Sequence, residues 1–274
     1  MEAWNVWWVG LCAAAVLNAA LWVLSFRAFR RKSLPAEILE SRKALLLLSL
    51  VYAAGCAFRS LLPMIDVERY CLHDPWIARI FVGRSVATIA ELAFAAQWAI
   101  LMKEAGAVRA ARAVLPLIAA AEVLSWLAVL TRNELFHAAE NTVWPLTAIL
   151  AVAFLATRWP FEGERGRMVI LGAVGSAAAY VAFMAAYVVP MYLARWQPGA
   201  EHLSLGAGLA EVLRPCTVVR DWSLWWQDAA WLTPYFTICV WMSVALAHAP
   251  DLRNRADASK PDRQGSGPPL RRVA

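Results

Sequence analysis

Three polar residues share one helical face in an otherwise apolar segment, residues 79–102. Arg84, Thr88 and Glu91 follow one another at i, i+4 and i+7, a spacing that stacks side chains along one stripe of a helix. Arg84 and Glu91 are about 10 Å apart along such a helix, so we expect each to find its partner on another helix. An arginine is a permanently charged donor to anions, whereas a glutamate can hold an arginine or take up a proton. This stripe is therefore the first candidate for a functional site.

Matching charges occur in other apolar segments. Arg59 and Glu122 fall at similar depths in two neighbouring segments. Because a charge inside a bilayer is costly, we expect the four charges to meet inside a helix bundle. We also expect Glu140, Asn141 and Asp228, near the outer ends of their segments, to line the same polar pocket. The alternative is an ion-pair network that fixes the packing of the helices without binding a ligand.

Carboxylates and an imidazole recur every three residues at the start of a later segment, as Glu134, His137 and Glu140. Glu-x-x-His is a ligand spacing of some carboxylate-bridged metal sites, and His73 in an earlier loop is a further candidate ligand. The alternative is a solvated helix start whose acidic side chains complement the helix dipole. A single copy of this spacing does not identify a metal, so the sequence names no cofactor.

The chain is too apolar for a water-soluble protein of its length. Of its 274 residues, 61% are hydrophobic and 17% are charged, against roughly a quarter charged in ordinary soluble domains. The mean hydropathy is +0.52, so lipid must cover apolar surface that one core cannot bury. A soluble enzyme is thereby excluded. The net charge of +6 is typical of a membrane protein with cytoplasmic lysines and arginines, so we expect a lipid bilayer rather than nucleic acid as partner.

Seven apolar segments are each long enough to cross about 30 Å of hydrocarbon as an α-helix. They comprise residues 4–26, 44–64, 79–102, 113–130, 139–157, 168–193 and 228–248. The sequence thus predicts an all-α, polytopic membrane protein with a seven-helix transmembrane bundle over residues 1–250. The remaining residues, 251–274, are rich in Pro, Gly and basic residues, which predicts a disordered cytoplasmic tail.

The basic residues orient the predicted bundle. Six lysines and arginines lie between the first two segments, which places this connection in the cytoplasm and the N-terminus outside. The alternation of seven segments then puts the C-terminus in the cytoplasm, and all four lysines fall on that side. We expect a multi-pass protein of the cell membrane, which in a bacterium is the inner membrane.

Two of the five cysteines, Cys71 and Cys216, fall outside the apolar segments, in the first and third outer loops. The outer side of the membrane permits disulfides, so we expect the two to be bonded. In the chain-entropy model such a bridge contributes about 4 kcal/mol, and it would hold the long loop of residues 194–227 over the end of the bundle. That loop also carries an amphipathic stretch over residues 203–213, which predicts a short interfacial helix.

Three functions fit these features. The leading hypothesis is a pocket on the outer side that binds or transports a small anionic or amphipathic ligand, with Arg59 and Arg84 as donors. One alternative is a membrane-embedded enzyme for a lipid or quinone-like substrate, using a metal or acid–base chemistry at His137, Glu140, His73 and Asp228. The other alternative is a non-catalytic assembly subunit. The sequence has no His-Glu-x-x-His, Gly-x-Ser-x-Gly, Cys-x-x-Cys or Walker motif that would select among them.

Overall fold

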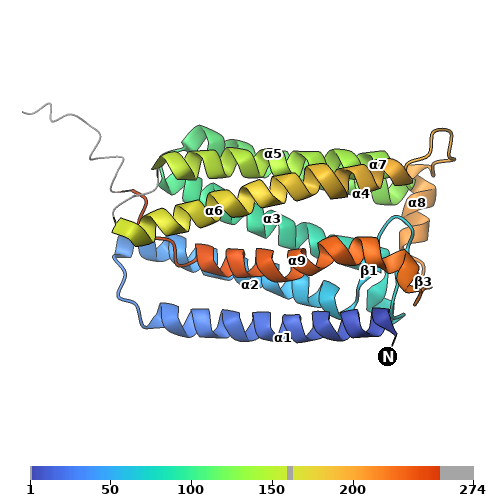
Figure 1. Ribbon diagram of the computed structural model, residues 1–274, viewed down its shortest axis with the longest axis horizontal. Coiled ribbons are helices and arrows are strands. Elements are labelled where there is room, and N and C mark those ends of the chain that lie inside the picture. Colours follow the sequence, from blue (N-terminus) through green and yellow to red (C-terminus); the bar gives the residue numbers. More distant parts are fainter. Residues whose placement is uncertain (1, 159–162, 254–274) are drawn as a thin grey trace, which may run out of the picture.

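A computed structural model describes residues 2–158 and 163–253 of the chain. The fold is all-α, with 78% helix, and its long helices lie alongside one another in an elongated bundle (Figure 1). Among the described residues, six helical stretches are long and apolar enough to cross a membrane: α1 (Ala3–Arg30), α2 (Ala36–Leu61), α3 (Ile80–Glu104), α4 (Val108–Thr131), Val174–Arg195 and α9 (Trp222–Leu246). Each overlaps a predicted segment, so the expectation of several membrane-length helices is confirmed. The predicted tail lies outside the described residues from position 254 onward.

The predicted span 139–157 falls in α5 (Glu134–Arg158), which packs against α4 and α6 in the bundle. A left-handed residue, Arg132 with φ 55°, ends α4, and the Asn133 side chain then accepts a hydrogen bond from the Leu135 N–H at the start of α5. In the part of the chain that the structure describes, α5 is not among the six helices that are both long and apolar enough to cross a membrane. The seventh span and the orientation therefore stay predictions.

One long helical run is interrupted by a wider turn. α6 (Gly163–Phe183) continues through the π-helical turn η2 (Met184–Val188) into α7 (Val189–Arg195). Pro190 lies in the first turn of α7 and has no N–H to donate to the turn before it. The helix accommodates this by widening, and such π-helical turns often lie beside functional sites.

Small and polar residues join the central helices. Gly55 of α2 faces Ala90 of α3 so closely that a Cβ at position 55 would lie 2.6 Å from the Ala90 Cβ. The Gln97 amide donates to the carbonyls of Leu45 (2.8 Å) and Ser243 (3.0 Å), and the Ser243 hydroxyl donates back to Gln97 Oε1 (2.6 Å). These contacts tie α2, α3 and α9 together by close packing and hydrogen bonding, the interactions that hold helices together in lipid.

Three strands of two residues each form a small sheet at one end of the bundle. β1 (Met64–Ile65) pairs antiparallel with β2 (Tyr70–Cys71), and β2 pairs parallel with β3 (Thr217–Val218), with the 3₁₀ turn η1 (Trp76–Ala78) nearby in sequence. Such short strands carry too few residues for an alternating pattern, and the sequence predicts only loops there. The N-terminus and α8 (Leu205–Val212) lie at the same end, which we call the sheet end (Figure 1).

The stretch predicted as an interfacial helix, residues 203–213, forms α8. The Ser204 hydroxyl caps it by accepting a backbone N–H of its first turn at 3.3 Å. Gly208 lies directly on the carbonyl of Leu130 in α4, where a Cβ would come within 1.8 Å of that oxygen. Leu205 and Leu209 are exposed, so α8 presents an apolar face away from the bundle. The helix is confirmed, while its position at a membrane interface stays a prediction.

Candidate functional site

The predicted polar stripe on α3 meets α4 in a buried cluster formed by Arg84, Thr88, Glu91 and Glu122, which we call the Arg84 cluster. Arg84 Nη2 lies 2.7 Å from Glu91 Oε2 and 2.7 Å from Glu122 Oε2. Thr88 donates to Glu122 Oε2 at 2.6 Å. The expectation that Arg84 and Glu91 are too far apart to pair directly is therefore wrong. The two long side chains cover the distance along the helix, and one guanidinium serves both carboxylates.

Arg59 lies next to this cluster but has its own partners. Its Nη1 is 3.0 Å from Asp66 Oδ1, and its Nη2 donates to the Met64 carbonyl at 3.0 Å. Asp66 Oδ2 is in turn 3.9 Å from Arg84 Nη1, so this carboxylate stands between the two arginines. Arg59, Asp66 and Arg84 are all buried. Both arginines are thus neutralised by carboxylates of the chain itself.

The start of α5 adds a histidine and a third buried glutamate. His137 Nδ1 lies 2.7 Å from Glu140 Oε2, and both side chains are buried, so the alternative of a solvated helix start is wrong. Oxygens of Glu91, Glu122 and Glu140 lie within 4.8 Å of one another, close enough to share a cation. Oε1 of Glu122 is buried without a hydrogen-bond partner, while Tyr235 of α9 donates to Glu91 Oε1 at 2.7 Å.

The predicted metal ligands do not form this group. Among the described residues, the group of carboxylates and histidines able to share an ion includes neither Glu134, His137 nor His73. His73 instead lies against the Trp8 ring, 4.5 Å between ring centroids, where burial and the charge of Arg220 lower its pKa. Glu134 is buried, with Oε2 unpaired. The structure therefore moves the candidate ion position from the start of α5 to the Arg84 cluster and Glu140.

Asp228, near the start of α9, belongs to a second polar group at the sheet end. Arg195 of α7 lies 2.7 Å from Asp228 Oδ2 and 3.3 Å from Glu68 Oε1, and it donates to Gln227 Oε1 at 3.0 Å. Burial raises the pKa of the Glu68 carboxyl, and the Arg195 charge only partly offsets this. The Asn141 side-chain amide donates a hydrogen bond to the His137 carbonyl of the same helix at 2.8 Å. Asp228, one of the predicted lining residues, thus links α9 to α7 through Arg195.

The polar groups border one cavity of about 530 Å³ inside the bundle. Its lining comes from α2, α3, α5, α6, η2, α7, α9 and the loop after α2. Toward the sheet end the lining is charged, and it includes the predicted Arg59, Arg84, Glu91, Glu140, Asn141 and Asp228. The rest is apolar and aromatic, with Phe94, Trp98, Trp144 and Phe183 among the lining residues. Thr88 and Glu122 support the charged end without lining the cavity.

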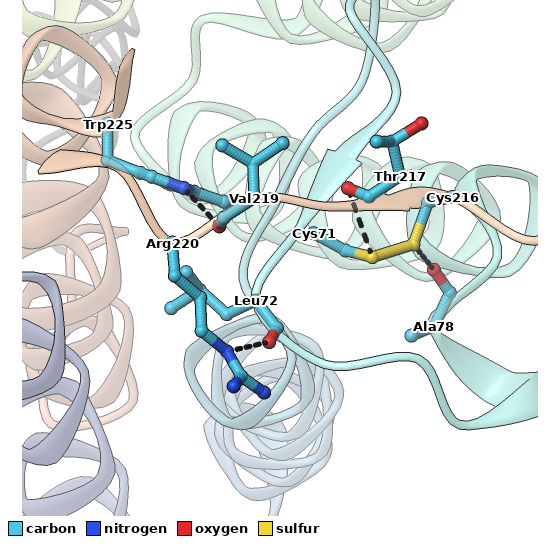
Figure 2. The surroundings of a disulfide bond; sticks show 8 residues. All are labelled: Cys71, Leu72, Ala78, Cys216, Thr217, Val219, Arg220 and Trp225. Carbon is cyan, nitrogen blue, oxygen red and sulfur yellow. Dashed lines mark hydrogen bonds between the residues drawn. A yellow bond between two sulfur atoms is a disulfide. The ribbon is translucent and has the colours of Figure 1, made fainter. Parts of the chain in front are cut away.

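A loop covers the charged end of the cavity. Residues 64–68, which we call the roof loop, line the cavity, and all but the half-buried Glu68 are buried. The predicted disulfide is present: Cys71 and Cys216 are bonded with Cα atoms 6.0 Å apart. Figure 2 shows that the chain after Cys216 is also held, since Arg220 donates to the Leu72 carbonyl. The roof loop therefore covers the cavity at the end of the bundle that carries the disulfide.

Three charged residues at this site, Asp66, Glu68 and Arg195, were not predicted as site members. Asp66 and Arg195 lie just beyond the ends of apolar segments, where the sequence alone suggests solvated loop charges. A signal did exist, because the buried Arg59 requires an acid and the buried Asp228 requires a base. Pairing Arg59 with the nearest opposite charge in sequence would have suggested Asp66, whereas Arg220 lies nearer to Asp228 in sequence than Arg195 does, so the same rule misses Arg195.

Comparisons with known proteins supply no template for this site. No protein-family model matches the chain, and no match was found among curated proteins or among solved structures. The function therefore has to follow from the cavity and its charges.

Proposed function

We propose that the chain is a seven-span membrane protein whose interior cavity binds an amphipathic small molecule taken from the bilayer. One observation carries this proposal: a cavity of about 530 Å³ has charged groups at one end and an apolar, aromatic remainder. Ligand cavities of this size are usually apolar with a few polar groups that orient the ligand. The polar end of the ligand would lie at the Arg84 cluster, and its apolar part would lie against Trp98 and Trp144.

The proposed topology includes α5 as the seventh span, with the N-terminus outside. α5 has 25 residues and packs along α4, as a spanning helix would. The disulfide at the sheet end supports placing that end in an oxidising compartment, such as the periplasmic face of a bacterial inner membrane. The lysines at the other end support a cytoplasmic position for it.

The charges favour a neutral or cationic polar group over an anionic one. The acidic lining residues are Asp66, Glu68, Glu91, Glu140 and Asp228, against the basic residues Arg59, Arg84 and His137. Both arginines already contact carboxylates, so an incoming anion would have to displace one of them. Of the two ligand classes expected from the sequence, amphipathic molecules remain and small anions become the less favoured class.

Lipid extraction of the purified protein tests this proposal. The wild-type chain, purified from its membrane in mild detergent, should carry a stoichiometric amphipathic molecule detectable by mass spectrometry. Glu91→Gln alters the polar end and should lower retention by about tenfold, the effect of losing roughly one charge-assisted hydrogen bond. Glu40→Gln, an exposed glutamate of α2, is the matched control and should retain the molecule. A wild-type protein that carries nothing and binds no added single-chain amphiphile would contradict the proposal.

A membrane-embedded enzyme is the second candidate, because two buried glutamates of the possible ion site, Glu91 and Glu140, line the same cavity as His137. Glu91, Glu122 and Glu140 are close enough to share a cation, and His137 paired with Glu140 is an acid–base arrangement. Metal analysis of protein purified without chelator tests the metal-dependent form of this candidate. A stoichiometric divalent ion that is lost in Glu140→Gln would favour the enzyme, whereas no ion and no turnover of single-chain lipids would favour binding alone.

A further inference from the structure

The cavity is exposed along one side only, among the described residues. Most of its lining residues are buried or half-buried. Those that line the cavity and are also exposed are Ser176 and Ala179 on α6, and Ile238 and Met242 on α9. Ile238 is 49% exposed and Met242 36% exposed. We call these four residues the side opening, because they stand on two different helices and face both the cavity and the surroundings.

Among the described residues, the polar side-chain contacts that join the α6–η2–α7 run to α9 lie near the sheet end. There Arg195 pairs with Asp228 at 2.7 Å, and the Tyr187 hydroxyl donates to the Gln227 carbonyl at 3.2 Å. Asp228 lies ten residues before Ile238 on α9, about 15 Å along the helix. The polar links thus close the gap between α6–α7 and α9 beside the charged end of the cavity and leave the apolar part unbridged.

The surroundings of the side opening are lipid if these helices span a membrane. Ser176 and Ala179 lie within the membrane-length stretch Val174–Arg195, and Ile238 and Met242 lie within α9. The side chains at the opening are small or apolar, as lipid-facing positions require. At the sheet end, by contrast, the buried residues of the roof loop cover the charged end of the cavity and the disulfide holds the next strand.

The geometry points to lateral entry: a single hydrocarbon chain of a membrane lipid passes from the bilayer into the cavity between α6 and α9. This inference rests on the proposed function and names its ligand class as a lipid with one chain free to enter. The polar group reaches the Arg84 cluster and the chain lies along the apolar wall, leaving through the side opening. The axial distance of about 15 Å between Asp228 at the charged end and Ile238 at the opening is within the reach of an extended chain of ordinary lipid length.

Photolabelling tests lateral entry at the level of single residues. The probe is a single-chain lipid with a neutral glycerol head and a diazirine on its chain, added to vesicles that contain the full-length protein. Ala148 and Ala151 of α5 line the cavity and are buried, whereas Ile149 of the same helix is 46% exposed. A chain in the cavity labels Ala148 or Ala151, and a chain in the surrounding bilayer labels Ile149. The ratio of the two signals therefore reports entry and corrects for the amount of probe.

Blocking the side opening separates this inference from the proposed function. Ala179→Trp combined with Ile238→Trp should lower interior labelling by about tenfold, because two indoles overlap the path of the chain. Ala178→Trp is the matched control, since Ala178 is exposed but does not line the cavity, and it should leave the ratio unchanged. Unchanged elution and unchanged Ile149 labelling show that a variant is folded, and Met242→Trp replaces the double variant if it is not.

The outcomes distinguish lateral entry from ligand binding in the cavity. Interior labelling that persists in the folded, blocked variant overturns lateral entry but leaves ligand binding in the cavity intact. Wild-type protein labelled at Ile149 and never at Ala148 or Ala151 overturns the proposed function and lateral entry together. Interior labelling that is lost in the blocked variant but unchanged in the Ala178→Trp control supports both lateral entry and the proposed function.

Discussion

A single guanidinium holds the centre of the polar site. Arg84 contacts Glu91 and Glu122 through one nitrogen, and Glu140 lies close by with His137 as its partner. If every group were ionised, the two carboxylates on Arg84 would leave one negative charge without a balancing cation of the chain. A bound proton or a cationic ligand group would balance that charge. This is the residue-level reason for favouring a neutral or cationic polar group in the ligand.

Arg84 is expected to be essential for folding as well as for the site. Arg84→Gln leaves Glu91 and Glu122 buried without their cation, and removing one partner of a buried ion pair costs about 3–5 kcal/mol. We expect a correspondingly large drop in the unfolding temperature of the purified protein. Arg132→Gln is the control, because Arg132 is exposed and lies 3.3 Å from a partly exposed Glu211. Equal stability of the two variants would show that the cluster is not held by Arg84.

Glu68 should make the protein less stable as the pH rises. Burial raises the pKa of its carboxyl above the ordinary value of 4.5, with Arg195 only partly offsetting this. The folded protein therefore holds the proton more tightly than the unfolded chain does, so stability falls from about pH 4.5 up through the folded pKa. Glu68→Gln stays neutral and should lose this part of the decline. Thermal unfolding between acidic and neutral pH measures it, with Glu40→Gln as control, and identical slopes for Glu68→Gln and wild type would contradict it.

The helices follow from the sequence better than the contacts between them do. Runs such as residues 44–64 are apolar for the length of a bilayer, so their helical state is predicted without knowing any neighbour. The pairing of Arg84 with Glu91 was missed because axial rise along a helix ignores the reach of two long side chains. The partner of Arg59 was missed because Asp66 belongs to a loop, and loop positions depend on the disulfide and on three two-residue strands. Such contacts are set by tertiary packing, which no local pattern encodes.

Docking of α8 onto α4 depends on one glycine. Gly208→Ala places a Cβ within 1.8 Å of the Leu130 carbonyl, so the helix must move away, at a cost of about 1–3 kcal/mol. Gly206→Ala in the same helix meets nothing within 4 Å and should be neutral or stabilising by about 0.5–1 kcal/mol. Chemical unfolding of both variants measures the difference. If Gly208→Ala is as stable as Gly206→Ala, α8 does not pack against α4 in the membrane.

At the scale of the whole molecule, the bundle is tied at the sheet end and loosely joined elsewhere along one side. The Cys71–Cys216 bridge links residues 145 apart in sequence, and Arg195 joins α7 to α9 at the same end. The opposite part of the α6–α9 gap is where the cavity lining is exposed. A protein that exchanges a ligand with water would have the exposed part of its cavity lining at an aqueous end of the bundle. This arrangement instead fits exchange with the bilayer, provided that the helices cross it as proposed.

The seven-span topology is the most general prediction, and it depends on whether α5 crosses the membrane. In a background where Cys12, Cys56 and Cys239 are replaced by Ser and the disulfide is kept, single cysteines are placed at Lys32, Arg132, Glu164 and Ser223. A membrane-impermeant maleimide added to intact cells should label Arg132→Cys and Ser223→Cys. Lys32→Cys and Glu164→Cys should react only after the membrane is permeabilised, because basic connections stay in the cytoplasm. If positions 132 and 164 react from the same side, α5 does not span the membrane and the seven-span topology is wrong. If each of the four cysteines reacts from the side opposite to the expected one, the number of spans is right but the orientation is reversed.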